Sequence, residues 1–172
     1  FGSALARFSS EAAPPALPTQ ARVVVCGGGI VGTSVAYHLA KLGWGDEVLL
    51  LEREQLTSGT TWHAAGLMVT FGSLSETSTE MRKHSKELYS TFLPEETGME
   101  TGFMPVGFIE LATDKGYLEE FRRVAAFNRK CGVDVHEISP AEVQRLFPLC
   151  DVQGVLAGFY VEDDGRVNPV DA

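Results

Sequence analysis

Cysteine, positive charge and long apolar runs are all scarce in this sequence of 172 residues. The three cysteines, Cys26, Cys131 and Cys150, lie far apart without the spacing of metal ligands, so we expect no metal site and give none of them a catalytic role. Cys26 lies in an apolar run and is expected to be a small buried core residue.

Two further shortages exclude classes of partner. The formal net charge of −9 argues against nucleic acid, because phosphate binding needs a basic face. No apolar run approaches the length of a membrane span, which predicts a soluble or at most peripheral protein. A chain of this length that is 44% hydrophobic can still bury the core of one ordinary domain.

The most informative motif is a glycine-rich turn between two apolar runs. Residues 23–26 form the first run, the glycines lie within residues 27–32, and apolar residues then recur at helical spacing as far as Gly43. The second run, residues 48–51, ends at Glu52. An ordinary glycine turn is the alternative, but a strand, a helix and a strand around the glycines predict a nucleotide-binding βαβ unit.

Each residue of this unit has an expected role in binding a dinucleotide. Gly27 permits the tight turn out of the strand, Gly29 lets the backbone approach a pyrophosphate, and Gly32 lets the helix pack closely on the sheet. The pyrophosphate would lie at the helix N-terminus, where N–H groups and the helix dipole favour negative charge. Glu52 is placed to accept hydrogen bonds from the ribose hydroxyls of the adenosine half, and its charge argues against NADP.

A loop of small residues follows, from Thr57 to Leu67, and it is interrupted by Trp62 and His63. Such a loop can bring many backbone N–H groups close to a ligand, and a solvent-exposed turn is the alternative. A Trp beside a His among small neighbours indicates a packed surface with a polar group. From the residues alone, His63 is either a ligand contact or a hydrogen-bonded core histidine.

The middle of the chain predicts alternating helices and strands. We expect a helix over residues 76–93 that Pro94 ends, and the apolar face of this helix contains Met81, His84, Leu88, Tyr89 and Phe92. On that face, His84 is expected at the edge of the core rather than at a ligand. The acids Glu95, Glu96, Asp163 and Asp164 are expected to be solvated loop charges.

Further along, the pattern predicts a strand over residues 106–111, a helix over 117–128 and a half-exposed strand over 133–138. Ser139, with Pro140 after it and Glu142 three residues on, predicts a capping box at the start of a short helix.

Both ends of the chain lead us to expect a fragment of a longer protein. The chain begins at Phe1 rather than at Met, and Asn168 followed by Pro169 resembles the beginning of a helix. Residues 1–20 carry Arg7 and a single acid among Ser, Ala and Pro. This composition is typical of either the tail of a mitochondrial presequence or a flexible N-terminal segment.

Taken together, the motifs resemble the dimethylglycine and sarcosine dehydrogenases, which are FAD-dependent amine oxidoreductases of the D-amino-acid oxidase superfamily. The resemblance is carried by residues 27–32, by Leu51-Glu52-Arg53 and above all by residues 56–67 with their Trp-His pair. It extends over residues 20–172 through the segments 95–98, 101–103, 107–109, 139–142 and 164–169. Asn168 departs from it, since Asp is common there in the family, and residues 71–75 match no pattern that we can name.

The resemblance implies an α/β fold with a Rossmann-like FAD-binding domain and the start of an inserted mixed-sheet substrate domain. Residues 1–20 would precede the fold, and residues 21–172 would form the N-terminal part of the oxidoreductase domain. It also implies that His63 carries FAD covalently through the 8α-methyl carbon of the flavin. The expected FAD-binding residues are Gly27, Gly29, Val31, Gly32, Glu52, Arg53, Ser58, Gly59, Thr60, Thr61, Trp62, His63, Ala64, Ala65, Gly66 and Leu67.

The activity that the resemblance implies is oxidation of an N-methylated glycine, sarcosine or dimethylglycine, by hydride transfer to FAD. Water or tetrahydrofolate would intercept the resulting iminium ion, and an electron-transfer flavoprotein would accept the electrons. The expected compartment is the mitochondrial matrix. The protein itself would position the flavin and tune its potential.

Two other functions stay open. A non-catalytic relative that resembles the regulatory subunit of pyruvate dehydrogenase phosphatase would keep the dinucleotide fold as a regulatory module, but that relative lacks the Trp-His pair that stands at Trp62 and His63 here. An NAD-dependent dehydrogenase would account for the βαβ unit and leave the Trp-His loop unexplained.

Overall fold

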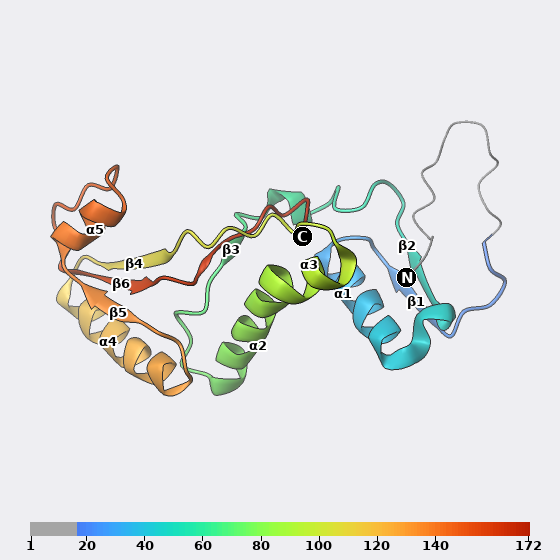
Figure 1. Ribbon diagram of the computed structural model, residues 1–172, viewed down its shortest axis with the longest axis horizontal. Helices are drawn as coiled ribbons and strands as arrows, with labels where there is room; N and C mark the ends of the chain where they lie inside the picture. The colour runs from blue at the N-terminus through green and yellow to red at the C-terminus, as the bar shows by residue number, and fades with distance from the viewer. Residues whose placement is uncertain (1–16) are drawn as a thin grey trace. The chain divides into compact units, whose positions relative to one another are not determined.

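The computed structural model describes residues 17–172 and divides into two compact units, unit 1 ending at Leu56 and unit 2 running from Thr57 to Ala172 (Figure 1). The expectations for residues 1–20 fall almost entirely outside the described residues. Within the described part, no helix is both long enough and apolar enough to cross a membrane.

Unit 1 is the predicted βαβ unit. Strand β1 (Val23–Cys26) pairs in parallel with β2 (Val48–Leu51), with Val23 opposite Val48. Helix α1 (Ile30–Leu39), the π-helical segment η1 (Ala40–Trp44) and the 3-10 turn η2 (Gly45–Glu47) connect the two strands. Gly43 has φ +88°, so the left-handed conformation that only glycine adopts easily ends the helical path where the sequence predicted a stop.

One face of this two-stranded sheet is exposed, which corrects the expectation that β1 and Cys26 are buried. Side chains alternate between the faces of a strand, and α1 packs on the face that carries Val25. Val24, on the opposite face, is 49% exposed, and Cys26 is also exposed. Within the described residues, one helix covers one face, and the apolar run alone could not distinguish one covered face from two.

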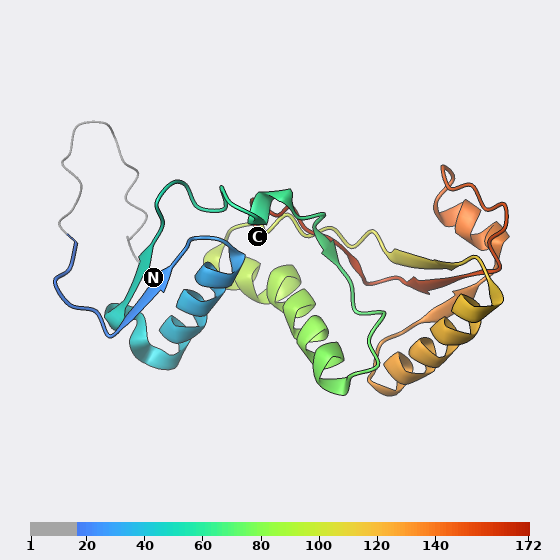
Figure 2. The same ribbon diagram turned by 180° about the vertical axis from the view of Figure 1, so that it is seen from behind.

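Unit 2 contains an antiparallel sheet in the order β4-β6-β5, formed by β4 (Phe108–Ala112), β6 (Ala157–Val161) and β5 (His136–Ile138). Helix α4 (Lys115–Lys130) packs on one face of it (Figure 2). Phe159 is fully buried at the centre of that core, and Phe71 stacks on it with the ring centroids 5.9 Å apart. The segment 71–75, which matched no sequence pattern, therefore supplies a core aromatic.

Helix α5 (Pro140–Leu146) contacts the sheet from the opposite face. A Cβ added to Gly158 would come within 2.6 Å of Val143, so glycine at this position of β6 allows α5 to lie close to the strand. The predicted cap is present, because Ser139 accepts a hydrogen bond from the N–H of Glu142 at 3.2 Å. The reciprocal half of the capping box is absent, since the carboxylate of Glu142 instead accepts from Arg145 at 2.7 Å.

A small second ladder joins β3 (Leu67–Met68) to β7 (Gly165–Arg166) in antiparallel pairing, and Met104 forms a bridge to Arg166 on the other side of β7.

The expected half-exposed strand 133–138 is shorter than predicted. Only residues 136–138 pair in the sheet, while Val133 and Val135 are buried in the core outside the ladder.

Helix α2 (Glu76–Glu87) continues through the π-helical segment η4 (Leu88–Phe92) into α3 (Leu93–Thr97), so the prediction that Pro94 ends the helix is wrong. Pro94 has no N–H to donate, and it follows directly on η4, where the π-helical pattern already interrupts the regular hydrogen-bond ladder of the α-helix. The helix ends instead at Gly98, whose φ is +68°.

The predicted apolar face of this helix is only partly the buried one: Leu88 is buried and Tyr89 is partly buried, as expected, whereas the residues of this face that lie on α2 itself are exposed. Met81 is 65% exposed and His84 is exposed, so His84 is not at the core edge. Thr79 is the fully buried residue of α2, and its partly buried positions are Ser78, Ser85 and the cations Arg82, Lys83 and Lys86. These cations reach acceptors on neighbouring segments, which is why they and not the apolar stripe face inward.

Candidate functional site

The glycine turn of unit 1 has the close packing that a dinucleotide cradle requires. Gly27 adopts φ +111°, and its N–H donates to the carbonyl of Leu51 at 2.8 Å, which ties the end of β1 to the end of β2. A Cβ on Gly32 would lie 1.9 Å from the Gly27 carbonyl oxygen, so a side chain there would push α1 away from the strand. Gly29 is the N-cap of α1 and has no side chain to cover the helix N-terminus.

Glu52 lies beside this turn with its carboxylate oriented by the backbone. Its Oε2 accepts the N–H of Gly28 at 2.7 Å, and its Oε1 accepts the N–H of Glu54 at 3.0 Å. The Gly28 hydrogen bond is the main reason that the pKa of Glu52 lies below its ordinary value, so the carboxylate is charged at neutral pH. Cys26, Gly27, Leu51, Glu52 and Arg53 line an open hollow of about 400 Å³ at this end of the strands.

The other two expected contacts of unit 1 are open to solvent. Val31 is 75% exposed in the first turn of α1. Arg53 is also largely exposed, and its nearest ionic partner is Glu54, at 3.8 Å. Both residues can therefore meet a ligand, but no contact among the described residues of unit 1 orients them as firmly as Glu52 is oriented.

The Trp-His segment lies in unit 2 as the short 3-10 turn η3 (Thr61–His63), and a network of backbone acceptors shapes it. Thr57 has φ +67°, an uncommon value for a residue with a side chain. The indole N–H of Trp62 donates to the Ser58 carbonyl at 3.1 Å, and its ring is tilted by 36° over that of His63 with the centroids 3.8 Å apart.

His63 has a defined tautomer in this loop. Its Nδ1 lies 3.0 Å from the carbonyl oxygen of Gly59, and because a carbonyl oxygen can only accept, Nδ1 must carry the proton. In the neutral imidazole, Nε2 is then unprotonated and is the nitrogen able to attack an electrophilic carbon. The side chain is exposed, so of the two sequence interpretations the buried core histidine is wrong.

The rest of the predicted loop is divided between exposed and packed residues. Gly66 has φ +72°, and a Cβ on it would lie 2.2 Å from the carbonyl oxygen of Val167, so this glycine is required by the pairing of two strands. Thr61 is buried, whereas the remaining residues of the segment are exposed: Ser58, Gly59, Thr60, Ala64, Ala65 and Leu67.

A polar cluster that the sequence did not reveal lies elsewhere in unit 2. Asp164 is fully buried, which corrects its assignment as a solvated loop charge. Its Oδ2 accepts the Thr70 N–H at 2.7 Å and its Oδ1 accepts the Thr70 hydroxyl at 2.8 Å, while Lys86 Nζ lies 3.4 Å from Oδ1. The two partners in the first pair are 94 residues apart, so no local pattern could have indicated the contact. Glu95, Glu96 and Asp163 are exposed, as expected.

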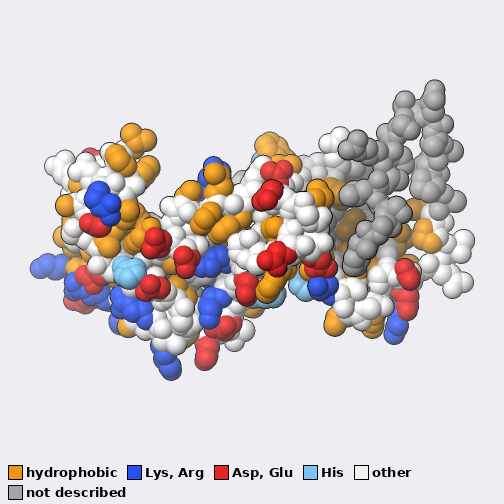
Figure 3. Space-filling view, viewed as in Figure 1, with side chains coloured by type: hydrophobic (Ala, Val, Ile, Leu, Met, Phe, Trp, Pro, Cys, Tyr) orange, Lys and Arg blue, Asp and Glu red, His pale blue; other side chains and the backbone are white. Residues whose placement is uncertain are grey.

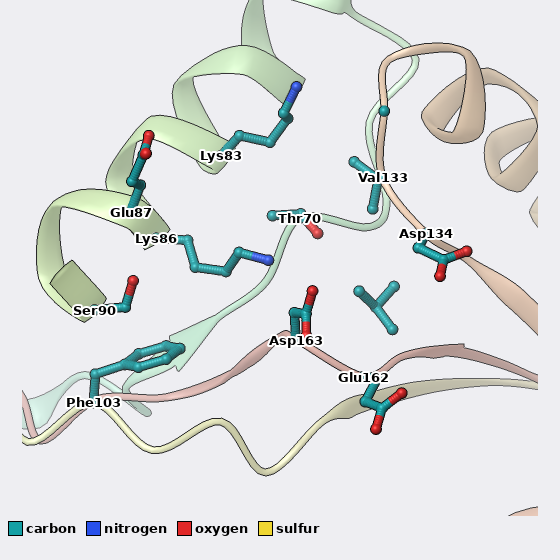
Figure 4. A pocket seen from close by; sticks show the side chains of 12 residues that line it. Thr70, Lys83, Lys86, Glu87, Ser90, Phe103, Val133, Asp134, Glu162 and Asp163 are labelled. Carbon is teal, nitrogen blue, oxygen red and sulfur yellow. The ribbon is translucent and has the colours of Figure 1, made fainter.

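Thr70 and Lys86 also line a cavity of about 480 Å³ between α2, the loop after α4 and the end of β6. Figure 4 shows the Lys86 side chain extending from α2 toward Thr70 and Asp163. Acids line this cavity together with its two lysines, and acidic and basic side chains are interspersed on this face of unit 2 (Figure 3).

Comparison with known proteins gives consistent matches. The family described as FAD dependent oxidoreductase matches residues 22–172. The mitochondrial sarcosine dehydrogenase of Mus musculus is 43% identical over 153 residues, which are 89% of this chain and 16% of the relative. Two further mitochondrial proteins of Mus musculus are each 40% identical to this chain. The match to the pyruvate dehydrogenase phosphatase regulatory subunit covers 95% of this chain and 18% of the relative. The match to dimethylglycine dehydrogenase covers 93% of this chain and 18% of the relative.

Among solved structures, L-proline dehydrogenase from P. horikoshii superposes with a TM-score of 0.80 at 31% identity, covering 90% of this chain and 40% of that structure. The chain thus spans 16% to 18% of the length of these curated relatives.

Proposed function

The chain belongs to the FAD-dependent oxidoreductase family, and from that premise we propose that it supplies the dinucleotide-binding part of a flavoprotein that dehydrogenates sarcosine or dimethylglycine. The observation that carries the cofactor assignment is Glu52, whose carboxylate the Gly28 N–H holds in the hollow at the ends of two parallel strands. The substrate class is supported by the 43% and 40% identity to relatives named sarcosine and dimethylglycine dehydrogenase.

The residues of unit 1 fit the adenosine diphosphate half of FAD. A carboxylate has about four lone-pair positions, and two of those on Glu52 are used by backbone N–H groups. The others can accept both ribose hydroxyls, while the negative charge disfavours a 2′-phosphate. The pyrophosphate is assigned to the turn of Gly27, Gly29 and Gly32 and to the N-terminus of α1, with Val31 and Arg53 beside it.

We assign covalent attachment of the flavin to His63, through a bond from Nε2 to the 8α-methyl carbon. The Nδ1 contact to Gly59 supports this, because in the neutral imidazole a proton on Nδ1 leaves Nε2 with a free lone pair. Forming the bond would replace a C–H bond of the 8α carbon by a C–N bond; two protons, one from that carbon and one from the imidazole, and two electrons would pass to dioxygen, which becomes hydrogen peroxide. The neighbouring residues Ser58 to Leu67 are assigned to the surroundings of the flavin.

FAD held by these residues would supply the hydride-accepting chemistry for oxidation of the N-methyl carbon of the substrate. The contribution of this chain is to hold the dinucleotide and to orient it through Glu52 and His63. We assign an electron-transfer flavoprotein as the electron acceptor, water or tetrahydrofolate as the trap for the substrate iminium ion, and the mitochondrial matrix as the compartment. Relatives whose names include "mitochondrial" support the organelle.

A regulatory role is the second candidate, and the 40% identity to the pyruvate dehydrogenase phosphatase regulatory subunit favours it. Such a protein could keep the cradle of unit 1 without oxidising an amine. The pair Trp62 and His63 argues for the dehydrogenase, because a purely regulatory module has no use for a nucleophilic histidine.

The covalent assignment is tested on the whole protein that contains this chain. After acid denaturation, we expect the wild-type protein to remain yellow and a proteolytic peptide containing His63 to carry the mass of FAD. The His63→Ala variant should bind FAD but release all of it on denaturation. Complete release of flavin from the wild-type protein would refute the anchor, and absence of flavin from the native protein would favour the regulatory role.

The Glu52 assignment needs a background without the covalent bond. We expect Glu52→Ala in His63→Ala to weaken FAD binding, since each lost charge-assisted hydrogen bond is worth about 1.5–3 kcal/mol. Arg53→Ala in the same background is the control and should weaken binding much less, because Arg53 is largely exposed. Turnover of sarcosine and dimethylglycine with an artificial electron acceptor then tests the substrate class.

A further inference from the structure

The buried carboxylate of Asp164 lies at the start of the ladder that leads to the His63 loop. Asp164 directly precedes β7, and its two hydrogen bonds to Thr70 join it to the segment that follows β3. Leu67 and Met68 of β3 pair with Arg166 and Gly165 of β7 between these bonds and the loop.

The same ladder is closed at its other end by Gly66. Its carbonyl accepts the N–H of Val167 at 2.7 Å, and the lack of room for a Cβ shows how closely the two backbones approach. Only Ala64 and Ala65 separate Gly66 from His63, and the N–H of Ala64 is bonded to the Thr61 carbonyl. The backbone position of His63 therefore depends on the position of β3, which Asp164 holds through Thr70.

The two hydrogen bonds between Asp164 and Thr70, which we call the clasp, require a carboxylate at position 164. The Thr70 N–H, the Thr70 hydroxyl and the Lys86 ammonium are all donors, and an ionised carboxylate only accepts. An amide of the same size would present its NH₂ group to one of these donors. Gly107 also donates its N–H to the backbone carbonyl of Asp164 at 2.7 Å, so the main chain of the residue is fixed as well.

We propose that Asp164 is a positioning residue for covalent flavin attachment: by clasping Thr70 it fixes β3 against β7 and so fixes where the imidazole of His63 stands. The proposal rests on the proposed function, in which His63 Nε2 carries FAD. A displacement of about 1 Å is enough to slow a reaction between bound groups by about a hundred-fold. Loss of the clasp should therefore slow bond formation more than it weakens binding of FAD to unit 1.

The test follows the covalent fraction of the bound flavin with time after FAD is added to the whole apoprotein. We expect attachment to be at least about ten-fold slower in Asp164→Asn than in wild type, with a smaller decrease in Thr70→Val, which keeps the backbone N–H bond. Asp163→Asn is the matched control, since it removes the same charge from the exposed neighbouring position, and it should attach FAD at the wild-type rate.

A merely structural role gives a different result. It would lower the amount of folded, FAD-binding protein while leaving the covalent fraction of the bound flavin and its rate of formation unchanged, and this outcome would overturn the proposal. If Asp164→Asn does not fold, the rate in Thr70→Val decides, and a wild-type rate there also overturns it. A wild-type protein with no acid-stable flavin would instead refute the anchor at His63 itself.

Discussion

At the residue scale, Gly32 has the least room for a side chain in unit 1. The distance of 1.9 Å between an added Cβ and the Gly27 carbonyl oxygen cannot be relieved by rotating a side chain, because the oxygen belongs to the backbone and the backbone also fixes the position of a Cβ. We expect Gly32→Ala to lower the free energy of unfolding by about 1–3 kcal/mol, as overpacking does, and to reduce FAD content.

Gly45 provides the matched control for that substitution. An added Cβ there finds its nearest neighbour, Ala40, at 3.7 Å, which is an ordinary contact. Denaturant unfolding and flavin content measured for Gly45→Ala should match wild type. If Gly32→Ala and Gly45→Ala lost stability and flavin to the same extent, the close approach of α1 to the strand would not matter for dinucleotide binding.

A second prediction at this scale concerns Glu110, which lies on β4 opposite the fully buried Phe159. Burial raises its pKa above the ordinary carboxyl value of 4.5. The folded protein then binds the proton more tightly than the unfolded chain, so this residue lowers stability as the pH rises through that range. Glu110→Gln should stabilise the protein at neutral pH by up to about 1 kcal/mol, because solvent screens a half-buried charge.

The pH dependence separates this cause from better packing. Well below pH 4.5, where the carboxyl group is protonated in both states, the stabilisation by Glu110→Gln should vanish. Thermal unfolding at both pH values measures it. A gain of the same size at acidic pH would show that desolvation of the charge is not the reason.

At the scale of elements, the sequence predicted what local chemistry determines. The glycine turn, the stop at Gly43 and the Ser139 cap are encoded within a few residues, and all three are present. The inward face of α2 was predicted wrongly, because its cations find acceptors on other segments: Arg82 on the Phe71 carbonyl and Lys83 on that of Cys131. Such contacts join residues far apart in the chain, so periodicity carries no signal for them.

Asn128 shows how one element holds another in place. Fully buried on α4, it accepts the Gly72 N–H at 3.1 Å and donates to the Ser73 carbonyl at 2.7 Å, in the segment that leads into α2. Asn128→Leu should destabilise the protein by about 1–3 kcal/mol for each group left without a partner. Denaturant unfolding measures the change.

The surface pair between Arg122 of α4 and Glu137 of β5 is the comparison for Asn128. Three contacts of 2.6–3.1 Å join the two side chains, and the Arg122 hydrogen bonds lower the pKa of Glu137. Solvent screens this pair, so Glu137→Gln should cost no more than about 1 kcal/mol. If Glu137→Gln lowered the free energy of unfolding more than Asn128→Leu does, this would contradict the expectation that the buried amide contributes more to stability than the exposed ion pair.

At the scale of the whole molecule, the proposed cofactor should link FAD to stability in a way that depends on His63. A ligand that binds only the folded state stabilises it by about 2.7 kcal/mol at a free concentration one hundred times its Kd. FAD bonded to the chain does not dissociate, so the unfolding midpoint of the wild-type holoprotein should not change when FAD is added. In His63→Ala the midpoint should instead rise steadily with the logarithm of FAD concentration.

Thermal unfolding over a range of FAD concentrations measures both midpoints. A wild-type midpoint that rises with FAD would contradict the covalent bond, and a His63→Ala midpoint that ignores FAD would contradict the cradle at Gly27, Gly32 and Glu52.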